Sequence, residues 1–349
     1  MDLSGEQLDR HRRALTSPRW WARSPVVVGR TARPSGWWIR LPEGDIDLHL
    51  SLLEAIDGGG TPLVRLDFHE HQRVRAAQLA RSPHIRHLEY LGLACAPRTV
   101  ERSDALGSLT VDSFDGHCST DRELRALSAS ETLVGLRELD LSGNRVTLAG
   151  LEALAASRAF RQLTHLRLRG NSPIQGSVVE VLARFPRLRA LDLSDVMGVD
   201  LRVGEPVSFP ELQRLRIRDS HVRDEALAQF LRKTRTPKLT HLVAAQNRAL
   251  GPATAEALAT DPVLSHLRVL DLHGARIGDA AGSKLAASEL LSSLRELRLG
   301  QTGAGEATAR AVVENSQLEL RALNLSAQGR PRDATITATT AVPWPRAPT

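Results

Sequence analysis

The feature that most constrains the fold of this chain is a leucine phrase that returns at a steady interval. In the segment that runs from Leu136 to Asn144, LRELDLSGN, leucines occupy relative positions 1, 4 and 6 and an asparagine occupies position 9. The same apolar pattern recurs seven more times, in steps of 24 to 28 residues. Such a period indicates a stack of similar units rather than one globular core. The first positions are Leu136, Leu163, Leu188, Leu212, Leu239, Leu267, Leu294 and Leu320.

Each unit predicts a short strand followed by a helix. Positions 4 and 6 alternate along the chain, so both side chains point to one face of a strand. That face is buried only when a neighbouring unit covers it, so one unit alone is not expected to fold. Between the strands, apolar residues recur at helical spacing in TLAGLEALAAS and HVRDEALAQFL. Asp224 and Asp279 follow their units' first leucines by 12 residues, which suggests helix N-caps.

The period, the helical return segments and phrases such as LRELDLSGNRVTLAGLEALAAS resemble leucine-rich repeat proteins of the ribonuclease-inhibitor-like class. Many bacterial proteins rich in arginine and alanine are similar. The resemblance covers about residues 60–328 and implies an α/β solenoid shaped as a horseshoe, with parallel strands on its concave face, helices on its convex face and about 10–11 repeats. Three of these are degenerate repeats expected upstream, at Leu63/Leu66/Phe68, Leu88/Leu91/Leu93 and Leu106/Leu109/Val111.

We expect three regions along the chain. Residues 1–60 lie outside the repeat pattern and hold two tryptophan pairs, Trp20-Trp21 and Trp37-Trp38. They suggest a capping region over the first repeat, with strands near 26–28, 37–41 and 46–50, although an independent recognition module remains an alternative. Residues 61–329 form the solenoid. Residues 330–349 are rich in Thr, Ala and Pro, which is typical of a disordered tail.

Composition and motifs argue against most enzymatic and metal chemistry. The pair of histidines in His69-Glu70-His71 lacks further ligands nearby, and Cys118 beside His117 is only a sequence neighbour pair. The glycines of residues 56–62 lack the lysine and hydroxyl of a phosphate loop. We therefore expect no cofactor, no metal and no enzymatic activity. Two cysteines, no apolar leader and no long apolar run predict a cytoplasmic, non-membrane protein.

The candidate binding site lies at strand positions 3, 5 and 7, which point away from the core. Position 5 alternates acid and base from Asp140 through Arg167 and Asp192 to Arg216, which alone indicates a self-neutralising ladder. Positions 3 and 7 add a basic excess in the middle of the array. Guanidinium groups suit carboxylates or phosphates. The predicted partner-binding residues are His165, Arg167, Arg169, Arg214, Arg216, Arg218 and His241.

These residues favour a non-enzymatic scaffold that binds a protein partner, with an acidic surface, on the concave face. Two alternatives stay open. The first is a regulatory role like that of repeat proteins of the same class that resemble GTPase-activating factors. Asn144, Asn171 or Asn247 would be candidate residues for that role only if their side chains were exposed. Arginine-mediated nucleic-acid binding is disfavoured because aromatic residues are scarce and 40 acidic residues are interleaved with the basic ones. The tryptophan-rich cap favours a monomer.

Overall fold

The computed structural model describes residues 27–31, 36–41, 63–68, 90–93, 111–114, 120–131, 133–171 and 174–326, with residues 54 and 88. The chain divides into two compact units between Leu163 and Thr164. Unit 1 ends at Leu163 and unit 2 begins at Thr164, and each is described by itself.

Unit 1 contains a sheet whose strands lie side by side in chain order. The first two strands form an antiparallel hairpin, and each later strand is parallel to its predecessor. The hairpin confirms two of the strands expected before residue 60; the third, near 46–50, lies outside the described residues, as do Trp20 and Trp21. The strands are β1 (Val27–Thr31), β2 (Gly36–Leu41), β3 (Leu63–Phe68), β4 (Tyr90–Leu93), β5 (Val111–Phe114) and β6 (Glu138–Asp140).

The strand β5 corrects one of the three degenerate repeats. The pattern Leu106/Leu109/Val111 predicts a strand near residues 108–110, whereas β5 begins at Val111, and its Asp112 pairs in register with Leu91 and Leu139. Leu109 is therefore position 1 of its repeat rather than position 4. The sequence pattern was ambiguous because aspartate stands at position 4, where the other repeats carry an apolar residue.

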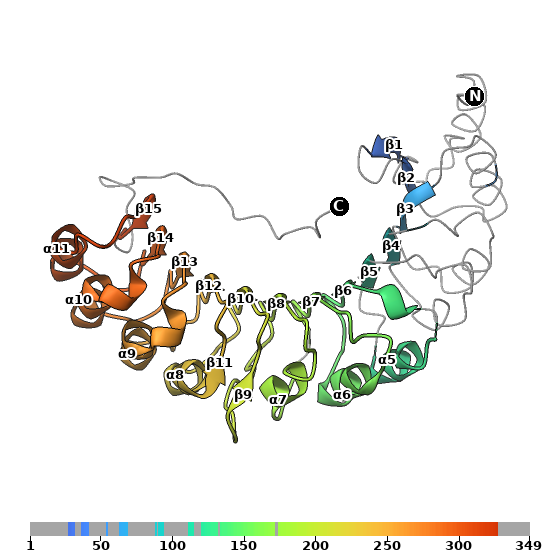
Figure 1. The fold of residues 1–349 in the computed structure, drawn as a ribbon, viewed down its shortest axis with the longest axis horizontal. Coiled ribbons are helices and arrows are strands. Elements are labelled where there is room, and N and C mark those ends of the chain that lie inside the picture. The colour runs from blue at the N-terminus through green and yellow to red at the C-terminus, as the bar shows by residue number, and fades with distance from the viewer. Residues whose placement is uncertain are drawn as a thin grey trace, which may run out of the picture. The chain divides into compact units, whose positions relative to one another are not determined.

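Seven described parallel strands of unit 2 belong to its larger sheet, and each one lies at positions 3 to 5 of a predicted repeat. Leu166, Leu191, Leu215, Leu242, Leu270, Leu297 and Leu323 lie at the centres of these strands, and every central leucine pairs with the next in register. The strands follow one another across the sheet in Figure 1. They are β7 (His165–Arg167), β8 (Ala190–Asp192), β10 (Arg214–Arg216), β12 (His241–Val243), β13 (Val269–Asp271), β14 (Glu296–Arg298) and β15 (Ala322–Asn324).

Helices connect these strands and lie on the opposite side of each repeat (Figure 1). In unit 2 they are α7 (Val178–Leu182), α8 (Asp224–Lys233), α9 (Pro252–Thr260), α10 (Asp279–Ala287) and α11 (Glu306–Glu314), with 3₁₀ turns η4 (Pro262–Leu264) and η5 (Glu289–Leu291). Between β8 and β10 a helix is replaced by an irregular segment whose Leu201 and Val203 are buried. This segment ends in β9 (Val207–Ser208), which pairs with β11 (Thr234–Arg235). In unit 1, α5 (Asp121–Ser128), η3 (Leu133–Gly135) and α6 (Leu148–Ala156) play the same connecting role.

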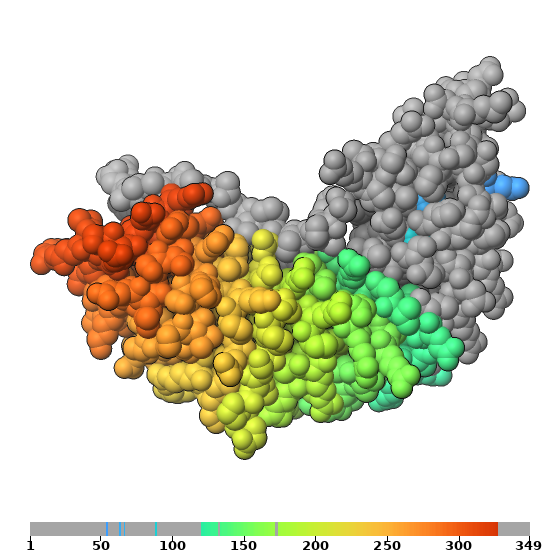
Figure 2. All heavy atoms as spheres, viewed as in Figure 1, coloured from blue at the N-terminus to red at the C-terminus, as the bar shows by residue number. Residues whose placement is uncertain are grey.

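The core consists of the repeated apolar positions. Leu163, Leu215, Leu242 and Leu270 are at most 1% exposed, because each repeat covers the apolar edge of the one before it. Figure 2 shows the successive repeats of unit 2 as adjoining bands of side chains. In β15, Leu323 is only half-buried, since no further described strand follows it.

The aspartates that the sequence suggests as N-caps do not cap their own helices. Each one accepts hydrogen bonds from the N-terminal backbone N–H groups of the helix in the next repeat. Asp224 and Asp279 are the first residues of α8 and α10. Asp224 accepts hydrogen bonds from the backbone N–H groups of Ala253 and Thr254, in the first turn of α9. Asp279 accepts from Gly305, Ala307 and Thr308 at the start of α11, and Asp121 accepts from Thr147 before α6. The capping therefore links one repeat to the next.

Candidate functional site

The sheet face of unit 2, defined by positions 3, 5 and 7 of its repeats, carries a group of five arginines. They come from two segments, around β7 and around β10, and the strand β8 lies between these and pairs with both. The outward positions of the repeat that contains β8 carry small or acidic residues, Ala190 and Asp192 in the strand and Ser194 after it. The structure thus brings the predicted residues to neighbouring rungs. We call Arg167, Arg169, Arg214, Arg216 and Arg218 the arginine cluster.

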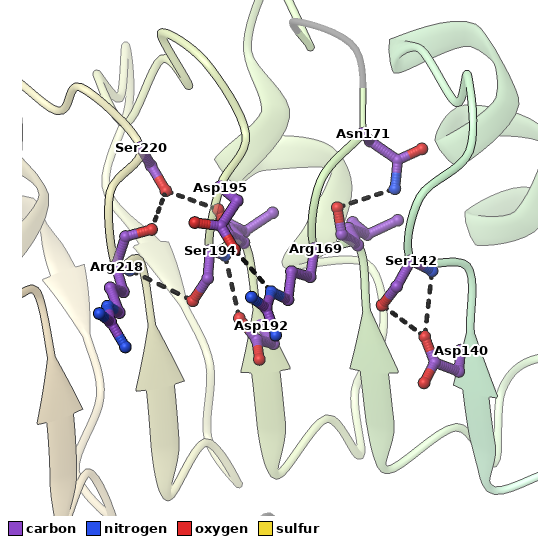
Figure 3. A network of polar contacts seen from close by, with 11 residues as sticks. Asp140, Ser142, Arg169, Asn171, Asp192, Ser194, Asp195, Arg218 and Ser220 are labelled. Carbon is purple, nitrogen blue, oxygen red and sulfur yellow. Dashed lines mark hydrogen bonds and ion pairs between the residues drawn. The ribbon is translucent and has the colours of Figure 1, made fainter. Parts of the chain in front are cut away.

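The members of the cluster differ in how far their charge is compensated. Arg169 donates from Nε to Asp195 Oδ2 at 2.5 Å, and this hydrogen bond raises the pKa of Arg169. Within the described residues, the guanidinium groups of Arg214 and Arg218 make no hydrogen bond or ion pair. Figure 3 shows this contrast between Arg169 and Arg218, whose backbone N–H donates to Ser194 Oγ at 3.2 Å. Arg218 is exposed, and Arg214 is half-buried.

Asp192 serves both as a turn residue and as a counter-charge. Its Oδ1 accepts the backbone N–H of Ser194 at 2.9 Å, and its side chain is buried. Burial lowers the pKa of Arg216, while the charge of Asp192 opposes that effect. Asp140 and Asp271 accept equivalent backbone N–H groups, from Ser142 and His273. An aspartate at position 5 therefore has a structural role, because its carboxylate accepts the backbone N–H of the residue two positions later.

The two histidines of the predicted site contribute hydrogen-bonding capacity rather than charge. Burial, followed by the charges of nearby arginines, lowers the pKa of both His165 and His241 to about 4. Each imidazole Nδ1 lies within hydrogen-bond distance of the preceding threonine hydroxyl, at 2.9 Å for Thr164 and 2.8 Å for Thr240. Both rings are neutral near pH 7, and the positive charge of the site comes from the arginines.

Beyond β12 the sheet face becomes acidic and largely self-paired. Arg298 Nη1 lies 3.5 Å from Asp271 Oδ2 on the adjacent strand, and Arg298 Nη2 lies 2.9 Å from Glu296 Oε2. The Arg298–Asp271 pair joins adjacent strands at position 5, outside the run from Asp140 to Arg216 for which the sequence predicts a self-neutralising ladder. The uncompensated positive charge of this face is therefore concentrated on the β7–β10 side.

Between the two regions lies a hollow of about 440 Å³. Its floor is Val243 and Ala245, at positions 5 and 7 of the repeat of β12, which carries no charged side chain at these positions. The sequence pattern indicates the arginines on one side of the hollow but not the hollow itself. The available signal was the pair of small apolar residues at two outward positions. The surrounding side chains include Arg216, Arg218, Gln246, Asp271, His273 and Asn324.

Comparison with protein-family models identifies the repeat in two segments of the chain. A family model described as "Leucine Rich repeat" matches residues 136–155 and 263–286. These segments are leucine-rich repeats. The solved structure of an internalin from Listeria monocytogenes is similar with 14% sequence identity and a TM-score of 0.45, over 79% of this chain and 76% of that one. No curated protein matches the sequence.

The asparagines of the leucine-rich repeats are structural. Asn144, Asn171 and Asn247 are 2%, 4% and 0% exposed. Asn247 Nδ2 donates to the carbonyl oxygen of Ile217 at 2.6 Å, and Oδ1 accepts from the N–H groups of Ser220 and Val222. The exposure that a GTPase-regulatory role for these asparagines would require is therefore absent at these three positions.

Hydroxyl side chains replace asparagine in two repeats where the ladder is degenerate. Ser220 Oγ donates to the carbonyl oxygen of Leu193 at 2.8 Å, the bond that Asn247 makes to Ile217 in the next repeat. Thr302 Oγ1 donates to the carbonyl oxygen of Leu299 at 2.6 Å. Both residues are buried. A single hydroxyl thus satisfies a carbonyl that would otherwise lie buried without a partner.

Other candidates from the sequence lie outside the described residues: the His69-Glu70-His71 segment, both cysteines, the glycines of residues 56–62 and the tail from 330 to 349. Across the ranges that are described, no group of three or more potential metal ligands occurs. The described helices are all too short or too polar to cross a membrane.

The neutral state of His241 leads to a measurable prediction. The ring packs near Arg214 and Arg216 of β10 and near Arg268 before β13. Because its folded pKa of about 4 lies below the unfolded value of about 6.5, the unfolded chain binds this proton more readily. The stabilising contribution of neutral His241 is therefore complete above about pH 6.5 and is lost as the pH falls toward 4.

In an NMR titration of the imidazole C–H resonances, we expect Arg214→Gln to raise the pKa of His241 by about half a pH unit, because one repelling cation is removed. Arg276→Gln, at an exposed position after β13, is the control and should leave the pKa unchanged. Equal titration midpoints in the wild-type protein and in Arg214→Gln would show that the charge of Arg214 does not lower the pKa of His241.

Proposed function

We propose that this protein is a non-enzymatic interaction scaffold that binds an acidic region of a partner protein through the arginine cluster. The observation that carries the proposal is the uncompensated charge of Arg214 and Arg218, which have no ion-pair partner among the described residues. They lie on the same face as Arg167 and Arg216, beside the small side chains of β8. An arginine fork binds a carboxylate through two parallel hydrogen bonds.

The rigidity of the scaffold supports this role. The strands that carry the cluster are fixed on both sides by parallel neighbours, and the leucines beneath them are buried. Little conformational entropy is lost when such a preformed surface binds. Acidic residues next to the cluster, including Asp192 and Asp195, disfavour a continuous polyanion such as a nucleic acid.

Charge reversal tests the proposal. We expect the triple variant Arg169→Glu, Arg214→Glu and Arg218→Glu to reduce capture of binding proteins from a lysate of the native organism more than about tenfold, because like charges replace attractive ones. Captured proteins are identified by mass spectrometry, and folding is checked by circular dichroism. Arg184→Glu, Arg232→Glu and Arg310→Glu form a matched triple control, since these exposed arginines lie on the helix side and the charge change is identical.

Three results would decide against the proposal. The first is unchanged capture by the sheet-face triple variant. The second is an equal loss of capture in both triple variants, which would indicate a nonspecific effect of net charge. The third is capture that disappears after nuclease treatment and falls steeply with salt, since such behaviour is typical of nucleic-acid binding.

A further inference from the structure

The hollow beside the arginine cluster is suited to hold a short apolar side chain. Val243 and Ala245 form its floor, while both neighbouring strands carry charged residues at the equivalent positions or close to them. Ala245 lines the hollow and carries only a methyl group, which extends little into the space above the sheet. A volume of about 440 Å³ falls within the usual range for a binding pocket.

On one side of this floor lies an available positive charge. Arg218 is exposed and makes no guanidinium hydrogen bond or ion pair with any described residue, and Arg216 lines the same wall. Burial already lowers the pKa of Arg216. A carboxylate placed here would compensate Arg218 and would lie near Arg216, whose charge Asp192 already opposes in part. Partial exclusion of water would strengthen the interaction with Arg218.

The other charged groups around the hollow are already compensated. Arg169 is paired with Asp195 at one end, and Arg298 is paired with Asp271 and Glu296 at the other. A guest with many negative charges would therefore meet these carboxylates and be repelled. The hollow favours a single acidic group beside uncharged ones.

Polar groups suited to a peptide main chain complete the site. Gln246 lines the hollow and has a backbone φ of 62°. Asp195, Asp219 and Gln301 have φ values of 50–58° at the same position of their repeats, so the left-handed backbone is general to this turn. The side-chain amide of Gln246 offers both a hydrogen-bond donor and an acceptor to a guest. On the far side, a Cβ at Gly300 would lie 2.6 Å from His273 Nδ1 and 2.8 Å from Asn324 Oδ1, so this strand leaves room only for its backbone.

From this combination we infer that the hollow over Val243 and Ala245 binds an extended segment of a partner protein in which one acidic side chain stands next to an aliphatic one. The carboxylate pairs with Arg218, and the aliphatic side chain rests on the floor. Gln246 and Asn324 hydrogen-bond to the main chain of the segment. This inference rests on the proposed function and names the chemistry of its partner.

The test is selection from a library of random seven-residue peptides displayed on phage, with the whole chain as bait. We expect the enriched peptides to contain Asp or Glu adjacent to Leu, Ile, Val or Met. Labelled copies of these peptides should lose at least tenfold in affinity for Ala245→Leu, which fills the floor, and for Arg218→Gln. The matched controls Ala280→Leu and Arg310→Gln, at exposed positions of α10 and α11, should bind as the wild type does.

The inference is overturned if no peptide is enriched, if the enriched peptides lack acidic residues, or if Arg218→Gln and Ala245→Leu both bind normally. Arg218→Gln changes an exposed side chain, so its result stands even if Ala245→Leu folds poorly. The two proposals can fail separately. If the triple glutamate variant loses partner capture while Ala245→Leu and Arg218→Gln capture normally, the scaffold proposal stands and the proposed peptide site in the hollow is wrong. Normal capture by the triple variant would remove the scaffold proposal.

Discussion

Replacing Asn247 with alanine is expected to lower the free energy of unfolding by about 3–5 kcal/mol. The side chain is 0% exposed and joins two repeats. It donates to the carbonyl oxygens of Ala244 and Ile217 and accepts the N–H groups of Ser220 and Val222. Alanine would leave two buried N–H groups without an acceptor, at about 1–3 kcal/mol each. Urea unfolding followed by circular dichroism measures the loss.

Two further substitutions serve as comparisons for Asn247→Ala. Asn247→Ser should retain part of the stability, because Ser220 already satisfies the equivalent carbonyl through its hydroxyl. Asn315→Ala removes a half-buried amide that donates to the carbonyl oxygen of Ala286 and accepts the backbone N–H of the exposed Gln317. Because water can replace the acceptor for that exposed N–H, a loss of about 1 kcal/mol is expected. If Asn247→Ala cost no more than Asn315→Ala, the asparagine would not link the repeats as described.

The second large effect is expected in the core. Leu270→Ala should destabilise the protein by about 3–4 kcal/mol, through lost burial and the cavity that remains. Leu270 is 0% exposed and lies between Leu242 and Leu297 on the adjacent strands. The same urea titration measures the difference.

Leu323→Ala is the matched control for this prediction. It occupies the same position of the repeat in β15 but is only half-buried, so we expect a loss of about 1–2 kcal/mol. Equal losses at the two leucines would mean that stacking of successive repeats does not determine the contribution of each one, contrary to the solenoid description.

Most of the fold was predictable because one physical requirement repeats along the chain. Leucines at positions 1, 4 and 6 must share a buried face, and this requirement placed every strand from β6 to β15 that belongs to the main sheet at positions 3 to 5. The prediction was wrong at β5, where Asp112 interrupts the apolar alternation and Leu109 could be assigned to two registers. The spacing of apolar residues cannot fix the register of a repeat when a polar residue, here Asp112, stands at position 4.

The candidate site was only partly predictable. The outward positions gave the arginine cluster, since alternation along a strand needs no tertiary information. Which arginines are compensated could not be read from spacing. Asp195 reaches Arg169 from a left-handed turn at position 8, with φ of 58°, whereas Arg218 has no such partner among the described residues. Likewise, Val243 and Ala245 look unremarkable in sequence, and only their charged neighbours on adjacent strands make them the floor of a pocket.

The hydrogen bonds from the capping aspartates make successive repeats depend on one another in one direction only, because the later repeat relies on the earlier one. Asp121, Asp224 and Asp279 each supply acceptors to a helix that comes later in the chain, and none of these bonds runs the other way. Truncation from the C-terminal side therefore leaves α6 and α9 with their acceptors, and the released carboxylate is simply hydrated. Truncation from the N-terminal side, for example between α8 and α9, strips the new first helix of the groups that satisfied its N–H donors. Shortened versions of this protein should accordingly be trimmed from the C-terminal end.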